Sequence, residues 1–182
     1  AERFSRLRES FDDKTWGVDT PSEKQMFYWA LFTSRLSDRA FARLRRQLRL
    51  PARLAQLHAQ QAALRKASVA LATAEQPGEI AAHLDEFDLE SLALAWLTTD
   101  DTTLQDKLTA YARTWRHVGS HLSGDDLKEL GYRPGPLFRE ILQGLRVARL
   151  DGAIRTRDEE IAWVEARFTP DATRPSPPKE AR

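Results

Sequence analysis

Helix start signals recur along this chain and constrain it to a helical fold. Thr20-Pro21-Ser22-Glu23 is a capping box with proline at the first helical position, and residues 156–159 form a second capping box. Apolar residues follow at spacings of three and four, as in Leu54, Leu57, Leu64 and Leu71, which is the period of a helix with one buried face. Alternating apolar and polar runs, which would indicate strands, do not rise above noise. The sequence therefore predicts an all-α fold, a multi-helix bundle or array of about eight to nine helices without a sheet.

The composition is that of a folded, water-soluble protein. Hydrophobic residues make up 41% of the 182 residues and charged residues 30%. There is no apolar run of the roughly 18 residues that a membrane span requires, and the charged start of the chain does not resemble a signal peptide. Cysteine is absent, which excludes disulfides and thiolate chemistry. We expect a cytoplasmic protein without a membrane partner.

The net charge of +1 conceals a strong segregation of charge along the chain. Residues 35–66 contain nine Lys or Arg and one acid, whereas residues 75–106 contain nine acids and no Lys or Arg. Residues 133–157 contain six Arg and two acids. Such segregation creates strong local fields in a nearly neutral protein. Arginine outnumbers lysine, a bias that either phosphate binding or an arginine-rich proteome would produce.

These shifts in composition suggest four segments. Residues 1–19 are interpreted as a linker-like stretch and residues 20–75 as a basic helical body. Residues 76–169 are interpreted as a helical tail region with a Gly-Pro hairpin, separated from the body by the turn at Gln76-Pro77-Gly78. Residues 170–182 are rich in proline and polar residues, and we expect a disordered tail.

Two groups of basic residues are candidates for phosphate binding. In the first, an apolar stripe of Leu36, Ala40, Leu44 and Leu48 is flanked by a stripe of Arg35, Arg39, Arg43 and Arg46. The second group lies in residues 122–142, which are predicted to form two helices joined by a tight turn. Gly131 permits a left-handed cap, and Gly135 permits close approach of a phosphate. Its second helix would begin with free N–H groups. The basic residues of this group are Arg133, Arg139 and Arg146. A plain αα-hairpin, with Gly and Pro serving only the turn, explains the same pattern.

Catalytic and metal-binding constellations are not evident. The chain has no Gly-rich phosphate loop, dinucleotide fingerprint or Gly-x-Ser-x-Gly elbow. His117 and His121 have the spacing of two zinc ligands on a helix. Histidines four residues apart near a helix end more often serve as helix caps or core residues, and we favour that interpretation. The acids at positions 85, 86, 88 and 90 surround a helix start, where acids are favoured by the helix dipole. We predict that this chain alone is not an enzyme and has no metal site.

A set of short motifs in residues 122–160 resembles the C-terminal region of bacterial tRNA nucleotidyltransferases and poly(A) polymerases. The motifs are Gly124-Asp125-Asp126-Leu127, Leu130-Gly131, Pro134-Gly135-Pro136, Ile141-Leu142, Leu150-Asp151-Gly152 and Thr156 to Glu160. The combination is specific, although each piece alone would be weak. Residues 44–71 are similar, more loosely, to the helical body of the same family, so that the resemblance covers about residues 22–164.

The resemblance implies a division of labour in a longer protein. In this family an N-terminal head carries the Gly-Gly-x-Val-Arg-Asp turn and the Asp-x-Asp metal pair, and neither motif occurs here. The chain would correspond to the body and tail that hold the acceptor and TΨC arms of tRNA. Mg²⁺ and the nucleotide would belong to the missing head, and this chain would need no cofactor of its own. Its partners would be tRNA or another structured RNA, and the head.

Two other functions are compatible with the same residues. A helix-hairpin-helix-like module would use the Gly-Pro turn to bind duplex DNA. A helical docking or structural domain would use the segregated charges to bind a protein. Whether the longer protein would add CCA, CC, A or a poly(A) tail is not encoded in these residues.

Overall fold

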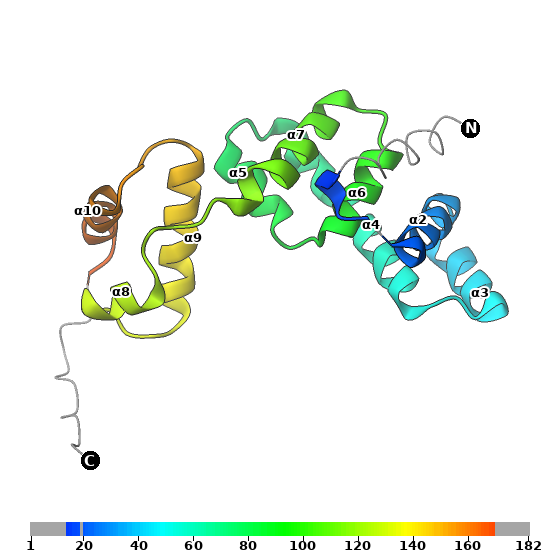
Figure 1. Ribbon diagram of the computed structural model, residues 1–182, viewed down its shortest axis with the longest axis horizontal. Coiled ribbons are helices and arrows are strands. Elements are labelled where there is room, and N and C mark those ends of the chain that lie inside the picture. The colour runs from blue at the N-terminus through cyan, green and yellow to red at the C-terminus, as the bar shows by residue number, and fades with distance from the viewer. Residues whose placement is uncertain (1–13, 19, 170–182) are drawn as a thin grey trace, which may run out of the picture. The chain divides into compact units, whose positions relative to one another are not determined.

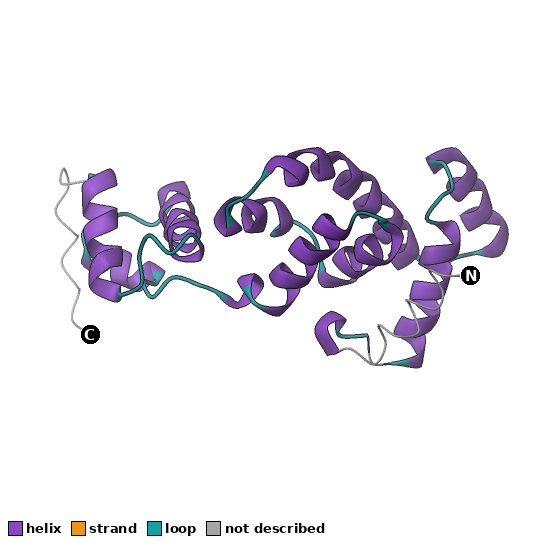
Figure 2. Cartoon of the chain, turned by 90° about the horizontal axis from the view of Figure 1, so that it is seen from above, coloured by secondary structure: helices purple, strands orange, loops and turns teal. Residues whose placement is uncertain are grey.

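The computed structural model describes residues 14–18 and 20–169, and every regular element in these ranges is helical (Figure 1). The described residues form nine α-helices and two 3₁₀ turns. In Figure 2 all regular elements of the described residues have the helix colour, and none has the strand colour. The predicted all-α class and the predicted number of helices are therefore confirmed. None of the described helices combines the length and the apolar character needed to cross a bilayer. The predicted tail 170–182 lies outside the described residues.

The chain divides into two compact units that meet between His117 and Val118. The boundary predicted near residue 76 is wrong, because it falls inside the first unit. There, α4 on one side of that turn contacts the three helices that follow it. The turn at residues 76–78 redirects the chain within a common core and does not separate two domains.

The N-terminal unit is organised around one long helix, α4. Its apolar residues Leu54, Leu57, Leu64 and Leu71 are all buried, as their spacing predicts. Helices α2, α5, α6 and α7 each contact α4. The unit contains η1 (Lys14–Trp16), α2 (Pro21–Thr33), α3 (Asp38–Leu48), α4 (Ala52–Thr73), α5 (Pro77–Leu84), α6 (Leu89–Thr98), α7 (Thr102–Arg113) and η2 (Trp115–His117).

The segment before α2 is partly built into this core. Trp16 and Val18 are buried, and the ring of Trp16 lies 5.9 Å from that of Trp96 on α6. The prediction of a linker-like stretch over residues 1–19 is therefore wrong for residues 14–18. Residues 1–13 and 19 lie outside the described part. The error arose because charged neighbours concealed two isolated core residues that have no helical periodicity.

The C-terminal unit contains α8 (Gly124–Glu129), α9 (Pro136–Leu150) and α10 (Arg157–Arg167). Its core joins Leu122, Leu127, Ile141, Leu145 and Val164, each of which is at most 2% exposed. The capping box predicted at Thr156 is present: the Thr156 side chain accepts from the Glu159 N–H, and the Glu159 side chain accepts from the Thr156 N–H. Small units of this kind depend strongly on close packing, because they have little core to lose.

One close contact fixes the approach of α10 to α9. A Cβ atom placed on Gly144 would lie 2.6 Å from Cη2 of Trp163, closer than two carbon atoms can pack. Trp163 is held in turn by the Arg167 guanidinium, 4.4 Å from its ring centre, and by Phe168. The glycine in the middle of α9 therefore makes room for the indole.

We predict that Gly144→Ala destabilises the protein even though alanine favours helices by about 1 kcal/mol. Overpacking against a rigid indole costs about 1–3 kcal/mol, which exceeds or offsets that gain. The measurement is thermal unfolding followed by circular dichroism. Gly119→Ala is the matched control, because no atom lies within 4 Å of its added Cβ. A Gly144→Ala variant that is more stable than the Gly119→Ala variant would contradict the prediction.

Candidate nucleic-acid interface

The turn of the C-terminal hairpin is built as the sequence predicts. α8 ends in a Schellman motif, in which the N–H of Gly131 donates to Lys128 O and the N–H of Tyr132 donates to Leu127 O, both at 3.0 Å. Gly131 has φ of 89°, which confirms its predicted left-handed conformation. The Tyr132 side chain is buried, and its hydroxyl donates to Phe168 O at 2.9 Å. The turn is thereby anchored at both ends.

The start of α9 is open toward solvent. Its N-cap, Gly135, has an extended backbone with φ of 169°, so the conformation itself does not require glycine. Among the described atoms, the one nearest to an added Cβ is the Arg133 carbonyl oxygen at 4.0 Å. No described side chain caps the first turn of α9. Uncapped N–H groups at the start of a 15-residue helix carry partial positive charge and favour an anion.

The structure brings only two of the three predicted arginines to this helix start. Arg133 and Arg139 are exposed and lie on either side of Gly135 in the sequence. Arg146 lies ten residues beyond Pro136, about 15 Å along the helix axis. Its Nε donates to the Val118 carbonyl at 2.8 Å. Arg146 thus holds the first residue of the C-terminal unit, and the geometry gives it a positioning role.

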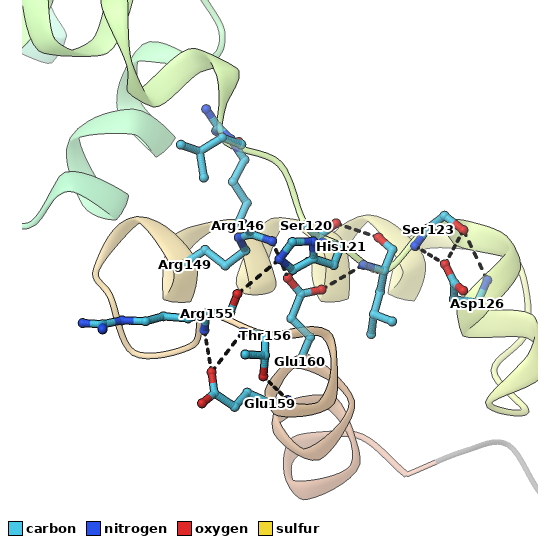
Figure 3. A network of polar contacts seen from close by, with 12 residues as sticks. Ser120, His121, Ser123, Asp126, Arg146, Arg149, Arg155, Thr156, Glu159 and Glu160 are labelled. Carbon is cyan, nitrogen blue, oxygen red and sulfur yellow. Dashed lines mark hydrogen bonds and ion pairs between the residues drawn. The ribbon is translucent and has the colours of Figure 1, made fainter.

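A buried carboxylate organises the same unit (Figure 3). The Glu160 side chain accepts from the backbone N–H of His121 at 2.9 Å and from that of Leu122 at 2.8 Å. Arg149 Nη1 donates to it at 3.1 Å, while Glu160 is fully buried. In the sequence, Glu160 is recognisable only as part of a family motif. Glu160 directly follows the capping residue Glu159, in the first turn of α10, where the helix dipole alone would explain an acid. The sequence therefore does not indicate that Glu160 is buried.

Two further carboxylates cap helices near this hairpin. Asp126 accepts from the hydroxyl and the backbone N–H of Ser123 and from the Arg157 guanidinium, which together hold its pKa well below the ordinary value. The pKa of Glu159 is also lowered, mainly because the backbone N–H groups of Arg155 and Thr156 donate to it. Both groups are therefore bound in their ionised form.

The predicted arginine stripe of the N-terminal unit is divided by the structure. Arg39, Arg43 and Arg46 follow one another at spacings of four and three on α3, and all three are exposed. Arg35 lies before α3, in the connection from α2. It lines a separate cavity of about 330 Å³ together with Arg65 of α4. Three of the four arginines therefore share one side of a helix, and the fourth does not.

The apolar stripe beside these arginines does not form the core of α3. Phe41 is the buried residue of that helix, with its ring stacked on His58 at 4.1 Å. Leu36 and Leu44 are only half-buried, and Leu48 is 51% exposed. With Phe32 of α2, which is 65% exposed, Leu36, Ala40 and Leu44 line an open groove. The sequence does not single out Phe32, because an aromatic residue within a helix is usually part of the core.

Acids of the acidic segment 75–106 and His121 form contacts within the protein. Asp88 caps α6 by accepting from the Ser91 N–H at 2.8 Å, and Arg53 pairs with Glu90 at 2.6 Å and with Asp88 at 3.1 Å. His121 Nε2 lies 3.2 Å from the Arg155 carbonyl. Within the described residues, no group of three potential ligands could hold a metal ion. The capping interpretation of the acid at position 88 is confirmed.

The described residues thus form an all-helical chain with two separate cationic surfaces, one on α3 and one at the start of α9. A stretch of 54 residues, 30% of the chain, is 44% identical to an A-adding tRNA nucleotidyltransferase of Geobacter sulfurreducens. That stretch corresponds to 6% of the length of this relative. No protein-family model matches the chain, and no solved structure matches it. The chain therefore contains a region related to a tRNA nucleotidyltransferase.

We predict that Glu160→Ala opens the C-terminal unit, because it leaves two backbone N–H groups and the Arg149 guanidinium without their buried acceptor. Removing one partner of a buried ion pair costs about 3–5 kcal/mol. Native-state hydrogen exchange at His121 and Leu122 measures this cost directly. Glu165→Ala, which removes an exposed carboxylate from the same helix, is the control. Equal exchange in the two variants would contradict the role assigned to Glu160.

The capping carboxylates predict a loss of stability in acid. A group whose pKa is lowered on folding stabilises the protein above its unfolded pKa, near 4 for Asp and Glu, and this contribution is lost as the pH falls through the folded value. Wild type should therefore exceed Glu159→Gln in melting temperature at pH 7, and the gap should narrow below about pH 4. Glu140→Gln, an exposed change on α9, is the control. A gap that is constant from pH 7 to pH 3 would contradict the assignment.

Proposed function

We propose that this chain is the RNA-holding body and tail of a tRNA nucleotidyltransferase-like protein, whose catalytic head lies outside it. The observation that carries the proposal is the 44% identity over 54 residues to an A-adding tRNA nucleotidyltransferase. The family motifs between Gly124 and Glu160 support the placement in the body and tail. In this proposal the chain holds the acceptor and TΨC arms of tRNA in the cytoplasm, and the head binds Mg²⁺ and the nucleotide.

The mechanism follows from how proteins bind duplex RNA. The deep major groove of A-form RNA excludes side chains, so binding relies on phosphates and on shape. The start of α9 offers uncapped N–H groups beside Arg133 and Arg139, which suits one phosphate group. Arg39, Arg43 and Arg46 offer a second, independent cationic row on α3. Neither surface reads base edges, which agrees with a role in holding tRNAs of different sequence.

We expect the protein to bind tRNA more tightly than a duplex DNA of matched length, with affinity falling steeply as salt rises. Arg139→Glu should weaken tRNA binding and reduce the slope of log affinity against log salt by about one unit, because it removes one phosphate contact. Fluorescence anisotropy with labelled nucleic acid measures both quantities. Arg116→Glu, which reverses an exposed charge on η2, is the matched control.

The same titration separates the alternatives. Equal binding to tRNA and DNA would favour a helix-hairpin-helix-like duplex-binding module. Absence of binding to either would contradict the RNA-holding role and favour a docking domain. If Arg139→Glu and Arg116→Glu behave alike while tRNA still binds, the start of α9 is not the interface.

A further inference from the structure

The groove between α2 and α3 combines two properties that the fold itself does not use. The apolar part of its lining is formed by Phe32, Leu36, Ala40 and Leu44, and its volume is about 530 Å³. Arg39 and Arg43 also line it. Phe32 is 65% exposed, whereas Tyr28, the other exposed aromatic residue of the described chain, is 38% exposed. An exposed phenyl ring beside two guanidinium groups is complementary to a ligand that has both an apolar part and an anionic part.

A duplex would use only the arginines of this face. In an RNA duplex the bases are stacked inside, so only phosphates and sugars would meet the groove, and the exposed ring would gain nothing. An unpaired nucleotide offers both required parts, a flat base and a phosphate. Bases that leave the stack are bound in proteins by aromatic rings and by the planes of arginine side chains.

We propose that the Phe32 groove binds an unpaired nucleotide of the RNA, with the base stacked on Phe32 and the adjoining phosphates paired with Arg39 and Arg43. This inference rests on the proposed RNA-holding function and adds a single-stranded element to it. The two arginines are four positions apart, so their side chains leave α3 about 5–6 Å from one another on the same side. Both can therefore serve one short segment of RNA backbone.

The neighbouring contacts agree with this use. The Trp29 ring meets Phe32 edge-on, with ring centres 6.2 Å apart, which steadies the phenyl ring from one side. α3 and its C-cap carry five arginines and one acid, Asp38. Asp38 is engaged by His58 Nε2 at 3.1 Å. Arg39 and Arg43 line the groove, and Arg46 lies on the same side of α3, so this side of the helix is positively charged.

This charge density favours RNA over a protein helix as the occupant. An apolar helix could fill the row of Leu36, Ala40 and Leu44, but it would place its own side chains against several arginines. It would need acidic residues at matching positions to offset that field. RNA carries a negative charge at every nucleotide, so any register of a single strand satisfies the arginines.

The test is a truncation that leaves the fold intact. Phe32→Ala removes an exposed ring, and its matched control is Val69→Ala, which removes an apolar side chain that is 74% exposed on α4. The probe is a labelled, non-self-complementary RNA of about 12 nucleotides, within the usual site size of single-strand binders. Stacking of one base predicts that Phe32→Ala binds this RNA about 5- to 150-fold more weakly than wild type. Val69→Ala should bind as wild type does.

Two further variants identify the contact. Phe32→Trp should retain binding because it keeps an aromatic face, whereas Phe32→Leu should lose most of it despite keeping an apolar side chain. Arg43→Gln should lower the salt slope for the same oligonucleotide by about 0.7, the value for one contact with a single strand. A fully paired, blunt-ended RNA duplex should bind Phe32→Ala and wild type equally.

The outcomes separate this inference from the proposed function. If tRNA binds but Phe32→Ala and Val69→Ala bind the oligonucleotide alike, the groove inference is overturned and the RNA-holding role stands. Loss of oligonucleotide binding in Phe32→Ala together with absent tRNA binding would support the groove and contradict the role in holding tRNA. Equal affinity of Phe32→Leu and wild type would overturn the stacking contact. Failure of wild type to bind any RNA would overturn both.

Discussion

The C-terminal unit depends on a buried carboxylate more than on any other polar group. Glu160 satisfies two backbone N–H groups of the segment that enters the unit, and it also accepts from Arg149. A lone carboxylate in this position would be strongly disfavoured, and three donors compensate for its burial. Because the donors come from the entering segment and from α9, one side chain of α10 fixes three parts of the chain together. The open start of α9 owes its fixed position to this network and to the Schellman turn before it.

The N-terminal unit shows the opposite arrangement for α3. Most of the core lies on α4 and on the helices that contact it, whereas α3 contributes one buried residue, Phe41, stacked on His58. The remaining sides of α3 face solvent and carry arginines. The unit therefore holds a cationic helix at its edge with few core residues, which leaves that helix available for contacts with another molecule.

The exposed arginines of α3 and the open start of α9 are the features that the proposed relationship to a tRNA nucleotidyltransferase would use. The related stretch corresponds to a small part of a much longer relative. An uncapped helix start and exposed arginines are features that favour the binding of a polyanion. In the proposed division of labour, the chemistry takes place elsewhere and the geometry of the helices positions the RNA.

The sequence by itself determined the helices, because capping boxes, proline at N1 and glycine at C′ act over four to six neighbouring residues. Thr20, Gly131 and Thr156 were identified for this reason. The sequence did not determine which side of α3 is buried, because its apolar stripe and Phe41 compete for the same core and only packing against α4 decides between them. The domain boundary, the internal contact of Arg146 and the exposure of Phe32 were likewise decided by tertiary structure. Each depends on residues distant in the chain, whose meeting leaves no local pattern.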